Sequence, residues 1–209
     1  MTKKERYKGV VGWFEENMPV AETELHYDSP FHLLVAVILS TQCTDKRVNM
    51  TTPELFNKFP DPKTLAEASF DEVFPLISSI SYPRNKSSHL IGMAQMLVND
   101  FGGEVPSDID QLMKLPGVGR KTANLIMGDV FHAPSSVVTD THLIRISNRI
   151  GLVDTKDPKK VEFELRKLLP PDESNDFCHR TVLHGRAVCT ARKAHCDICT
   201  LKDFCKKKI

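Results

Sequence analysis

The sequence predicts an all-α protein, and three observations support that prediction. Apolar residues recur at helical spacing in almost every segment, helix-start signals precede several of these stripes, and period-two alternation with turn signals is nearly absent. A chain of 209 residues is long enough for one large domain or two small ones. Its hydrophobic content of 41% and charged content of 26% are ordinary for a globular protein.

The expected helices follow apolar stripes that alternate with turn residues along the chain. In order, these stripes cover residues 7–18, 31–39, 90–101, 143–150, 161–168 and 177–188. The stripe at residues 31–39 is apolar on almost every side, which predicts a central, buried helix. A Pro-Ser-Ser stretch within residues 131–136 interrupts the helices and marks the expected seam between two parts of the chain.

Several helix starts are marked by residue types that cap a helix. Ser29-Pro30 places an N-cap residue before a proline at the first helical position. Ser69 and Glu72 have the spacing of a capping box. Ser107 is expected to cap a short helix that ends at Lys114.

Four of the six cysteines gather near the C-terminus with the spacing C-x6-C-x2-C-x5-C. They are Cys189, Cys196, Cys199 and Cys205. Disulfides fit this set poorly, because a chain of this length can bury a core without them and nothing in the sequence suggests an oxidising compartment. Four thiolates suit a tetrahedral zinc site or a [4Fe–4S] cluster, and residue chemistry alone leaves both open. Cys43 and Cys178 lie outside this spacing and are expected to be buried thiols.

The formal net charge of +1 gives no hint of a nucleic-acid partner, but two basic islands stand out locally. Residues 111–128 hold Lys114, Arg120 and Lys121 with no acid. Residues 189–209 hold six Lys or Arg against two Asp, a local charge of +4. Such islands are either solvated faces, which is the commoner case, or two contacts with one polyanion.

The segment Leu115–Ala123 predicts a tight hairpin between two short helices. Pro116 ends the first helix, and Gly117 and Gly119 permit a turn whose backbone can approach a ligand closely. Gly119 also lies at the start of the next helix, where N–H groups and the helix dipole favour an anion. Together with the flanking leucines and the basic surroundings, this pattern is typical of a helix–hairpin–helix that binds a nucleic-acid phosphate without reading sequence.

The hairpin sequence LPGVGRKTAN, the segment Val138–His142, the segment Leu183–Arg186 and the four C-terminal cysteines together resemble the endonuclease III family of base-excision-repair glycosylases. The resemblance covers nearly the whole chain. It implies an all-α fold of two helical lobes with a DNA-binding cleft between them. The implied six-helix domain spans residues 22–133 and carries the helix–hairpin–helix at about residues 108–131. The implied cluster domain combines residues 1–21 with 134–209, and in this family the cysteines of the loop 189–205 hold a [4Fe–4S] cluster.

The resemblance also implies two catalytic residues. From its position alone Lys121 could contact a phosphate, whereas in the family the matching lysine attacks the sugar carbon that holds the damaged base, forms a Schiff base and cleaves the strand by β-elimination. Spacing alone favours Asp140 as a helix N-cap, whereas the resemblance makes it the catalytic carboxylate. Mismatch-specific adenine glycosylases of the superfamily lack the lysine, so Lys121 favours a bifunctional enzyme.

Further DNA-contacting positions follow from the same resemblance. Gln42 matches a glutamine that fills the gap left by a flipped base, and Tyr82 aligns with a second wedge residue that is often leucine in the family. The implied lining of the damaged-base pocket consists of Asp45, Thr141 and His142. The implied phosphate contacts are made by Gly117 and Gly119 and by the basic loop residues Arg192 and Lys193, while His195 is not required as a cluster ligand.

The expected function is therefore a DNA glycosylase with AP-lyase activity. The expected partner is duplex DNA that contains oxidised pyrimidines or abasic sites, and the expected cofactor is a [4Fe–4S] cluster. The sequence shows neither a secretion signal nor a membrane-spanning run, so we expect a cytoplasmic, nucleoid-associated monomer. A monofunctional mismatch glycosylase and a non-catalytic helix–hairpin–helix protein are the alternatives. Lys121 and the short sequence after Cys205 oppose the first, and Lys121 together with Asp140 opposes the second.

Overall fold

The computed structural model describes residues 1–207, and regular secondary structure in that range is helical. Apart from the helices, one isolated antiparallel bridge pairs Cys189 with Ala194. The all-α prediction is confirmed. Contacts divide the chain into two compact units, a continuous unit at residues 24–131 and a discontinuous unit that combines residues 1–23 with residues 132 onward.

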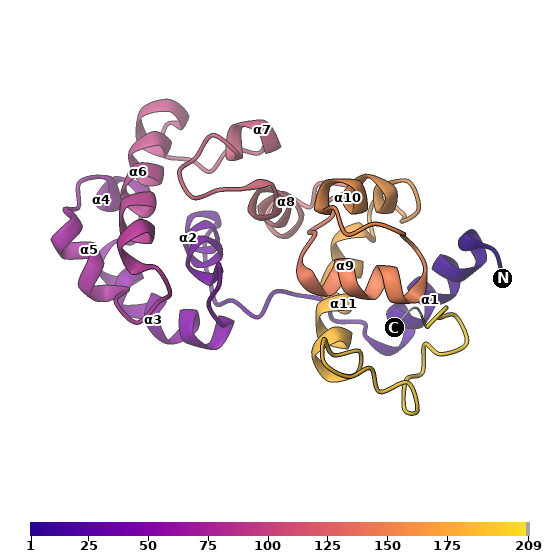
Figure 1. The fold of residues 1–209 in the computed structure, drawn as a ribbon. Coiled ribbons are helices and arrows are strands. Elements are labelled where there is room, and N and C mark those ends of the chain that lie inside the picture. The colour runs from indigo at the N-terminus through magenta and orange to yellow at the C-terminus, as the bar shows by residue number, and fades with distance from the viewer. Residues whose placement is uncertain (208–209) are drawn as a thin grey trace. The chain divides into compact units, whose positions relative to one another are not determined.

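The continuous unit is built around a buried central helix. Its helices are α2 (Pro30–Ser40), α3 (Asp45–Lys58), α4 (Pro62–Ala66), α5 (Phe70–Leu76), α6 (Pro83–Phe101), α7 (Ile109–Leu112) and α8 (Arg120–Asp129). Every residue from Phe31 to Leu39 of α2 is buried, and α2 packs against α3, α6 and α8 (Figure 1). The apolar run therefore forms the central helix that its composition predicts.

Within the continuous unit, the structure agrees with two of the three predicted helix caps. The Ser29 hydroxyl accepts the N–H of His32 at 3.1 Å, and the Glu72 carboxylate accepts the N–H of Ser69 at 3.0 Å. The prediction that Ser107 caps the next helix is wrong. Asp108 caps α7 instead, by accepting the N–H of Gln111 at 2.9 Å, and carboxylate and hydroxyl caps have similar strength.

The discontinuous unit joins the two ends of the chain. It contains α1 (Lys3–Asn17), α9 (Thr141–Ile150), α10 (Pro158–Arg166) and α11 (Ser174–Ala187), and α11 packs against both α1 and α9. The fully buried rings of Phe14 and Phe177 meet edge to face, with their centroids 5.7 Å apart. Aromatic burial of this kind fastens α1 to α11.

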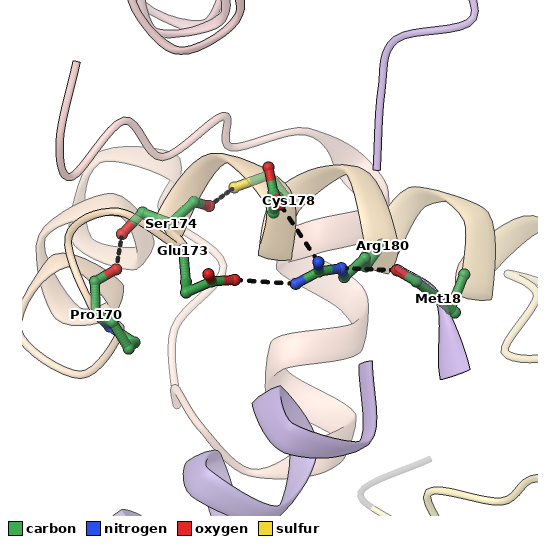
Figure 2. Close-up of polar contacts among 7 residues, drawn as sticks. Met18, Pro170, Glu173, Ser174, Cys178 and Arg180 are labelled. Carbon is green, nitrogen blue, oxygen red and sulfur yellow. Dashed lines mark hydrogen bonds and ion pairs between the residues drawn. The ribbon is translucent and has the colours of Figure 1, made fainter. Parts of the chain in front are cut away.

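A buried guanidinium adds a polar link between the same two helices. Arg180 of α11 donates to the carbonyl of Met18 at 3.0 Å and forms an ion pair with Glu173 at 3.1 Å (Figure 2). Since a buried charge is tolerated only when it is paired, this arrangement fixes the end of α1 against α11.

The structure also places the two cysteines outside the C-terminal set. Cys178 is buried, and its thiol donates to the carbonyl of Ser174 at 3.1 Å, as Figure 2 shows. The same sulfur accepts the N–H of Val138 at 3.3 Å. Cys43 is half-buried, so the expectation of a buried thiol is correct for Cys178 and wrong for Cys43, which lies in a turn at the end of α2.

Within residues 1–207, no helix combines the length and apolar character that a membrane crossing requires.

Candidate active site and cysteine pocket

Gly117 gives the hairpin between α7 and α8 its shape. Its φ is +82°, and a Cβ atom at this position would lie 3.1 to 3.3 Å from side-chain atoms of His89. Both the backbone and the neighbouring side chain therefore favour glycine here. The turn is fixed to the core by Leu115 and Val118, which are buried and joined by a 3.1 Å backbone hydrogen bond.

The presence of glycine at position 119 cannot be explained by a positive φ or by crowding, as it can at position 117. Its φ of −93° suits any residue, and an added Cβ would meet no atom within 4 Å. Neither backbone strain nor packing within the chain requires glycine here. Gly119 is also the N-cap of α8, where no side chain caps the helix. The open space beside a helix start admits the close approach of an anionic ligand oxygen.

Lys121 and Asp45 interact electrostatically within the continuous unit. Lys121 is exposed on the first turn of α8, and Asp45 is half-buried at the first position of α3. Burial raises the pKa of the Asp45 carboxyl, and the positive charge of nearby Lys121 offsets part of that rise. The predicted nucleophile therefore lies within electrostatic range of one residue of the predicted base pocket.

The two predicted wedge residues share an unusual backbone. Gln42 and Tyr82 are both exposed, and both have a φ of +56°. Residues other than glycine adopt this left-handed conformation at a cost, and such strain concentrates at functional sites. Tyr82 is 62% exposed and directly precedes Pro83, the first residue of α6.

Asp140 begins α9 in the discontinuous unit, so Lys121 and Asp140 lie in different units. One oxygen of its half-buried carboxylate accepts the N–H of Leu143 at 2.7 Å, so the expected N-cap is confirmed. Capping occupies one oxygen with this N–H and holds the side chain in place. Thr141 is exposed beside it and His142 is half-buried.

Arg145, which the sequence reasoning missed, holds His142 and the start of the cysteine segment together. Its guanidinium lies 3.1 Å from Nδ1 of His142, donates to the carbonyl of Gly185 at 3.3 Å and donates twice to the carbonyl of Cys189, at 3.2 and 3.1 Å. Since a guanidinium only donates, Nδ1 of His142 accepts. The spacing of one helical turn could have indicated the contact with His142, but nothing in the sequence indicates the contacts with Gly185 and Cys189.

Gly185, within the segment Leu183–Arg186, lies where α11 approaches α9. A Cβ atom at this position would lie 2.6 Å from Nδ1 of His142 and 2.9 Å from the guanidinium of Arg145. Only glycine therefore allows α11 to approach α9 this closely.

The four C-terminal cysteines line one pocket of the discontinuous unit, together with His184 and Arg149. Burial raises the pKa values of the Cys199 and Cys205 thiols, and the charges of the neighbouring thiolates add to the rise. Arg149 donates to the sulfur of Cys189 at 3.3 Å. Four thiols whose thiolate charges would repel one another around a pocket, with an N–H donor to one of them, match the chemistry of a cationic metal centre. No group of three or more His, Cys, Asp or Glu side chains within residues 1–207 has the geometry to hold a single metal ion.

The basic loop between Cys189 and Cys196 is fixed by its own hydrogen bonds. The Thr190 hydroxyl donates to the carbonyl of Lys193 at 2.6 Å and accepts the N–H of Lys193 at 3.1 Å. Arg149 donates to the carbonyl of Thr190 at 2.7 Å. The side chains of Arg192 and Lys193 are exposed on this turn and are available to a polyanion.

Comparisons with known proteins identify the family. A model described as the HhH-GPD superfamily of base excision DNA repair proteins matches residues 35–171. An endonuclease III from Synechocystis sp. is 42% identical over 204 residues, which cover 98% of this chain and 93% of that protein. The chain belongs to the endonuclease III family.

Solved structures agree with this membership. A non-covalent endonuclease III–DNA complex and a trapped endonuclease III–DNA covalent intermediate each match with a TM-score of 0.92 and 38% sequence identity, over 99% of this chain and 97% of the other. This member of the family is a base-excision-repair DNA glycosylase with AP-lyase activity.

Proposed function

We propose that this enzyme removes oxidised pyrimidines from duplex DNA and cleaves the resulting abasic site through a Schiff base on Lys121. The observation that supports this most directly is the position of Lys121, exposed on the first turn of α8 immediately after the hairpin and within electrostatic range of Asp45. A lysine amine placed there can reach a sugar whose neighbouring phosphate is bound by the hairpin.

The proposed reaction begins with the Lys121 amine as nucleophile. Its nitrogen forms a bond to C1′ of the damaged nucleotide, while the bond between C1′ and the base breaks and the base leaves with the electron pair. Loss of a proton from nitrogen and opening of the sugar ring then give an imine. Removal of a 2′ proton expels the 3′ oxygen with its phosphate, which cleaves the strand by β-elimination, and water releases the lysine.

Asp140 is the proposed catalytic carboxylate. As the base departs, positive charge develops on the sugar, and a fixed carboxylate can stabilise that charge and assist proton transfer. The hydrogen bond from the N–H of Leu143 holds the Asp140 side chain in position at the start of α9. A carboxylate that is already fixed needs little reorganisation during the reaction.

DNA recognition is proposed to combine phosphate contacts with base flipping. Gly117 and Gly119 let the hairpin backbone approach one phosphate, and Arg192 and Lys193 contact another part of the strand. Because the reacting base must leave the duplex, Gln42 and Tyr82 are proposed to fill the space it vacates. Their exposed positions support this role.

The flipped base is proposed to contact Asp45, Thr141 and His142. Asp45 lies within electrostatic range of Lys121, and Thr141 and His142 are the two residues after Asp140, so each proposed pocket residue lies near a proposed catalytic residue. We place the enzyme in the cytoplasm at the nucleoid, where its DNA substrate is found.

We further propose that Cys189, Cys196, Cys199 and Cys205 hold a [4Fe–4S] cluster. The four cysteines that line one pocket supply the soft sulfur donors such a cluster requires. When bound, the cluster supplies a structural crosslink rather than a catalytic step. Arg192 and Lys193 are exposed on the loop between Cys189 and Cys196.

Variants of Lys121 and Asp140 test the proposed division of labour. Borohydride should trap a covalent adduct between the native enzyme and DNA, and Lys121→Ala should abolish both the adduct and strand cleavage while DNA binding persists. Asp140→Asn keeps a capping oxygen and should slow base excision by about 10²–10⁴-fold. With an abasic substrate, whose base is already gone, Asp140→Asn should slow strand cleavage less than Lys121→Ala does. An adduct formed by Lys121→Ala would show that another amine is the nucleophile.

A further inference from the structure

Lys86 is a buried cation that the proposed chemistry does not use. It lies on the first turn of α6 and is 5% exposed. Burial lowers the pKa of its ammonium group, and a positive charge at a helix start also meets the unfavourable end of the helix dipole. A lysine in this place must therefore be stabilised by specific partners.

Those partners are two backbone carbonyls at the end of α2. The ammonium nitrogen of Lys86 donates to the carbonyl of Leu39 at 2.8 Å and to the carbonyl of Thr41 at 2.6 Å. Hydrogen bonds from a charged donor are stronger than neutral ones. The second of these carbonyls belongs to the peptide that links Thr41 to Gln42.

That peptide is the centre of a tight turn. The N–H of Cys43 donates to the carbonyl of Ser40 at 3.0 Å, Thr41 has φ −60° and ψ 115°, and Gln42 has φ +56°. These values describe a type II turn, whose third position normally carries glycine or asparagine because it requires a positive φ. Glutamine at this position is strained.

A type I turn would relieve the strain at Gln42. Type I and type II turns differ by a flip of the central peptide, and after the flip the third residue returns to a negative φ. The flip would also turn the carbonyl of Thr41 away from Lys86 and break the 2.6 Å hydrogen bond. The ammonium group thus opposes the flip.

We propose that Lys86 is a positioning residue that holds the Thr41–Gln42 peptide in the type II orientation and so presents the Gln42 side chain to DNA. The proposal rests on the gap-filling role proposed for Gln42. Lys86 also donates its own backbone N–H to the carbonyl of Tyr82 at 3.2 Å. This bond is the i→i−4 hydrogen bond at the start of α6, so the Lys86 side chain links the turn at Gln42 to the helix that directly follows Tyr82.

A stability experiment tests the turn without reference to catalysis. Gln42→Gly and Gln42→Ala both remove the side chain, but only glycine adopts a positive φ without strain. In the protein with Lys86, we expect Gln42→Gly to have the higher urea midpoint of the two. In a Lys86→Met background the turn can relax, so the order should reverse, because glycine loses more conformational entropy on folding.

A kinetic experiment tests the consequence for base excision. With thymine glycol in duplex DNA under single-turnover conditions, Lys86→Met and Gln42→Ala should each slow excision by about tenfold, the loss of one positioning interaction. The double variant should be within about twofold of Gln42→Ala alone, because both changes disable the same group. Arg84→Met is the matched control, since Arg84 is an exposed cation on the same turn that lies over the ring of Phe74. It should change the rate by less than about threefold.

The two experiments separate the possible failures. If alanine is more stable than glycine at position 42 in the protein with Lys86, or if the order is the same in both backgrounds, the role of Lys86 is overturned. If Gln42→Ala leaves excision unchanged, the gap-filling role is wrong, while the stability order still decides whether Lys86 holds the turn. If Lys86→Met does not fold, Lys86→Gln, which stays polar but removes the charged donor to the Thr41 carbonyl, replaces it, and the same reversal of the order is expected.

Discussion

The hairpin at residues 113–119 and the cysteine segment at residues 189–205 both expose groups proposed to contact DNA, but they are held in different ways. The hairpin lies on a hydrophobic core, into which Leu115 and Val118 are buried. In the cysteine segment, Leu201 is the one apolar side chain that is fully buried among the described residues, and Ile198 is 66% exposed. Apolar packing therefore supports the first region far more than the second.

This difference indicates what each region needs in order to fold. The hairpin is shaped by packing and by Gly117, both of which the chain supplies by itself. The cysteine segment is held by side-chain contacts to backbone atoms, such as the hydrogen bonds from Arg149 to Thr190 and from Arg6 to Phe204. A few such contacts contribute little net stability, so this segment should depend on metal ligation.

We expect the largest effect when one of the four proposed cysteine ligands is replaced. Purified protein should be brown and contain about four iron and four sulfide per chain. Cys199→Ser should lose the colour, expose the cysteine segment to proteases and abolish tight DNA binding. The continuous unit should keep most of its helical circular dichroism, because its core does not involve the cysteines.

Cys43→Ser is the matched control for Cys199→Ser. Cys43 is half-buried at the end of α2, in the continuous unit, so this variant should stay brown. A colourless native protein with one zinc per chain would contradict the cluster.

A second prediction compares the two glycines of the hairpin. Gly117→Ala places a Cβ at φ +82° against His89, so we expect a loss of about 1–2 kcal/mol in the free energy of unfolding. Gly119→Ala meets no such obstacle, and its stability should change by less than about 1 kcal/mol. Its affinity for abasic-site DNA should nevertheless fall about tenfold, because the methyl group occupies the space proposed for a phosphate.

For both variants, urea denaturation measures the free energy of unfolding, and fluorescence anisotropy measures the affinity for abasic-site DNA. Unchanged DNA affinity in Gly119→Ala would show that the open space beside α8 is not a phosphate site.

The sequence predicted the all-α fold because helical periodicity and capping are local signals. The buried helix at residues 31–39 is one example, and the cap made by Asp140 is another. The roles of Arg145 and Lys86 could not be predicted in this way. Arg145 donates to the backbone carbonyl of Cys189, and Lys86 donates to the backbone carbonyl of Thr41, each in a segment distant in sequence. A carbonyl has no residue-type signature, so no motif marks such a contact.

Charge removal in the basic loop should give a smaller effect. Affinity should fall with salt and depend little on the sequence around the lesion, and replacing Arg192 and Lys193 by alanine should reduce the slope of log affinity against log salt by about two. The same change at Lys159 and Lys160 of α10 is the matched control, because both residues are exposed cations outside the proposed interface. An unchanged slope in the first variant would show that the loop faces solvent.

We expect the smallest effect at Asp45. A variant of this residue tests whether a carboxylate in the proposed base pocket lowers the stability of the continuous unit. Burial raises the pKa of this carboxyl above its usual value, so the folded state keeps the proton at a pH where the unfolded state has lost it. Stability should therefore fall as the pH rises from the ordinary aspartate range through the raised pKa. Asp45→Asn, which stays neutral, should be more stable than the native protein at pH 7, and the gain should shrink in acid. Urea midpoints at several pH values measure this, and a gain that does not depend on pH would mean that the Asp45 charge has no part in it.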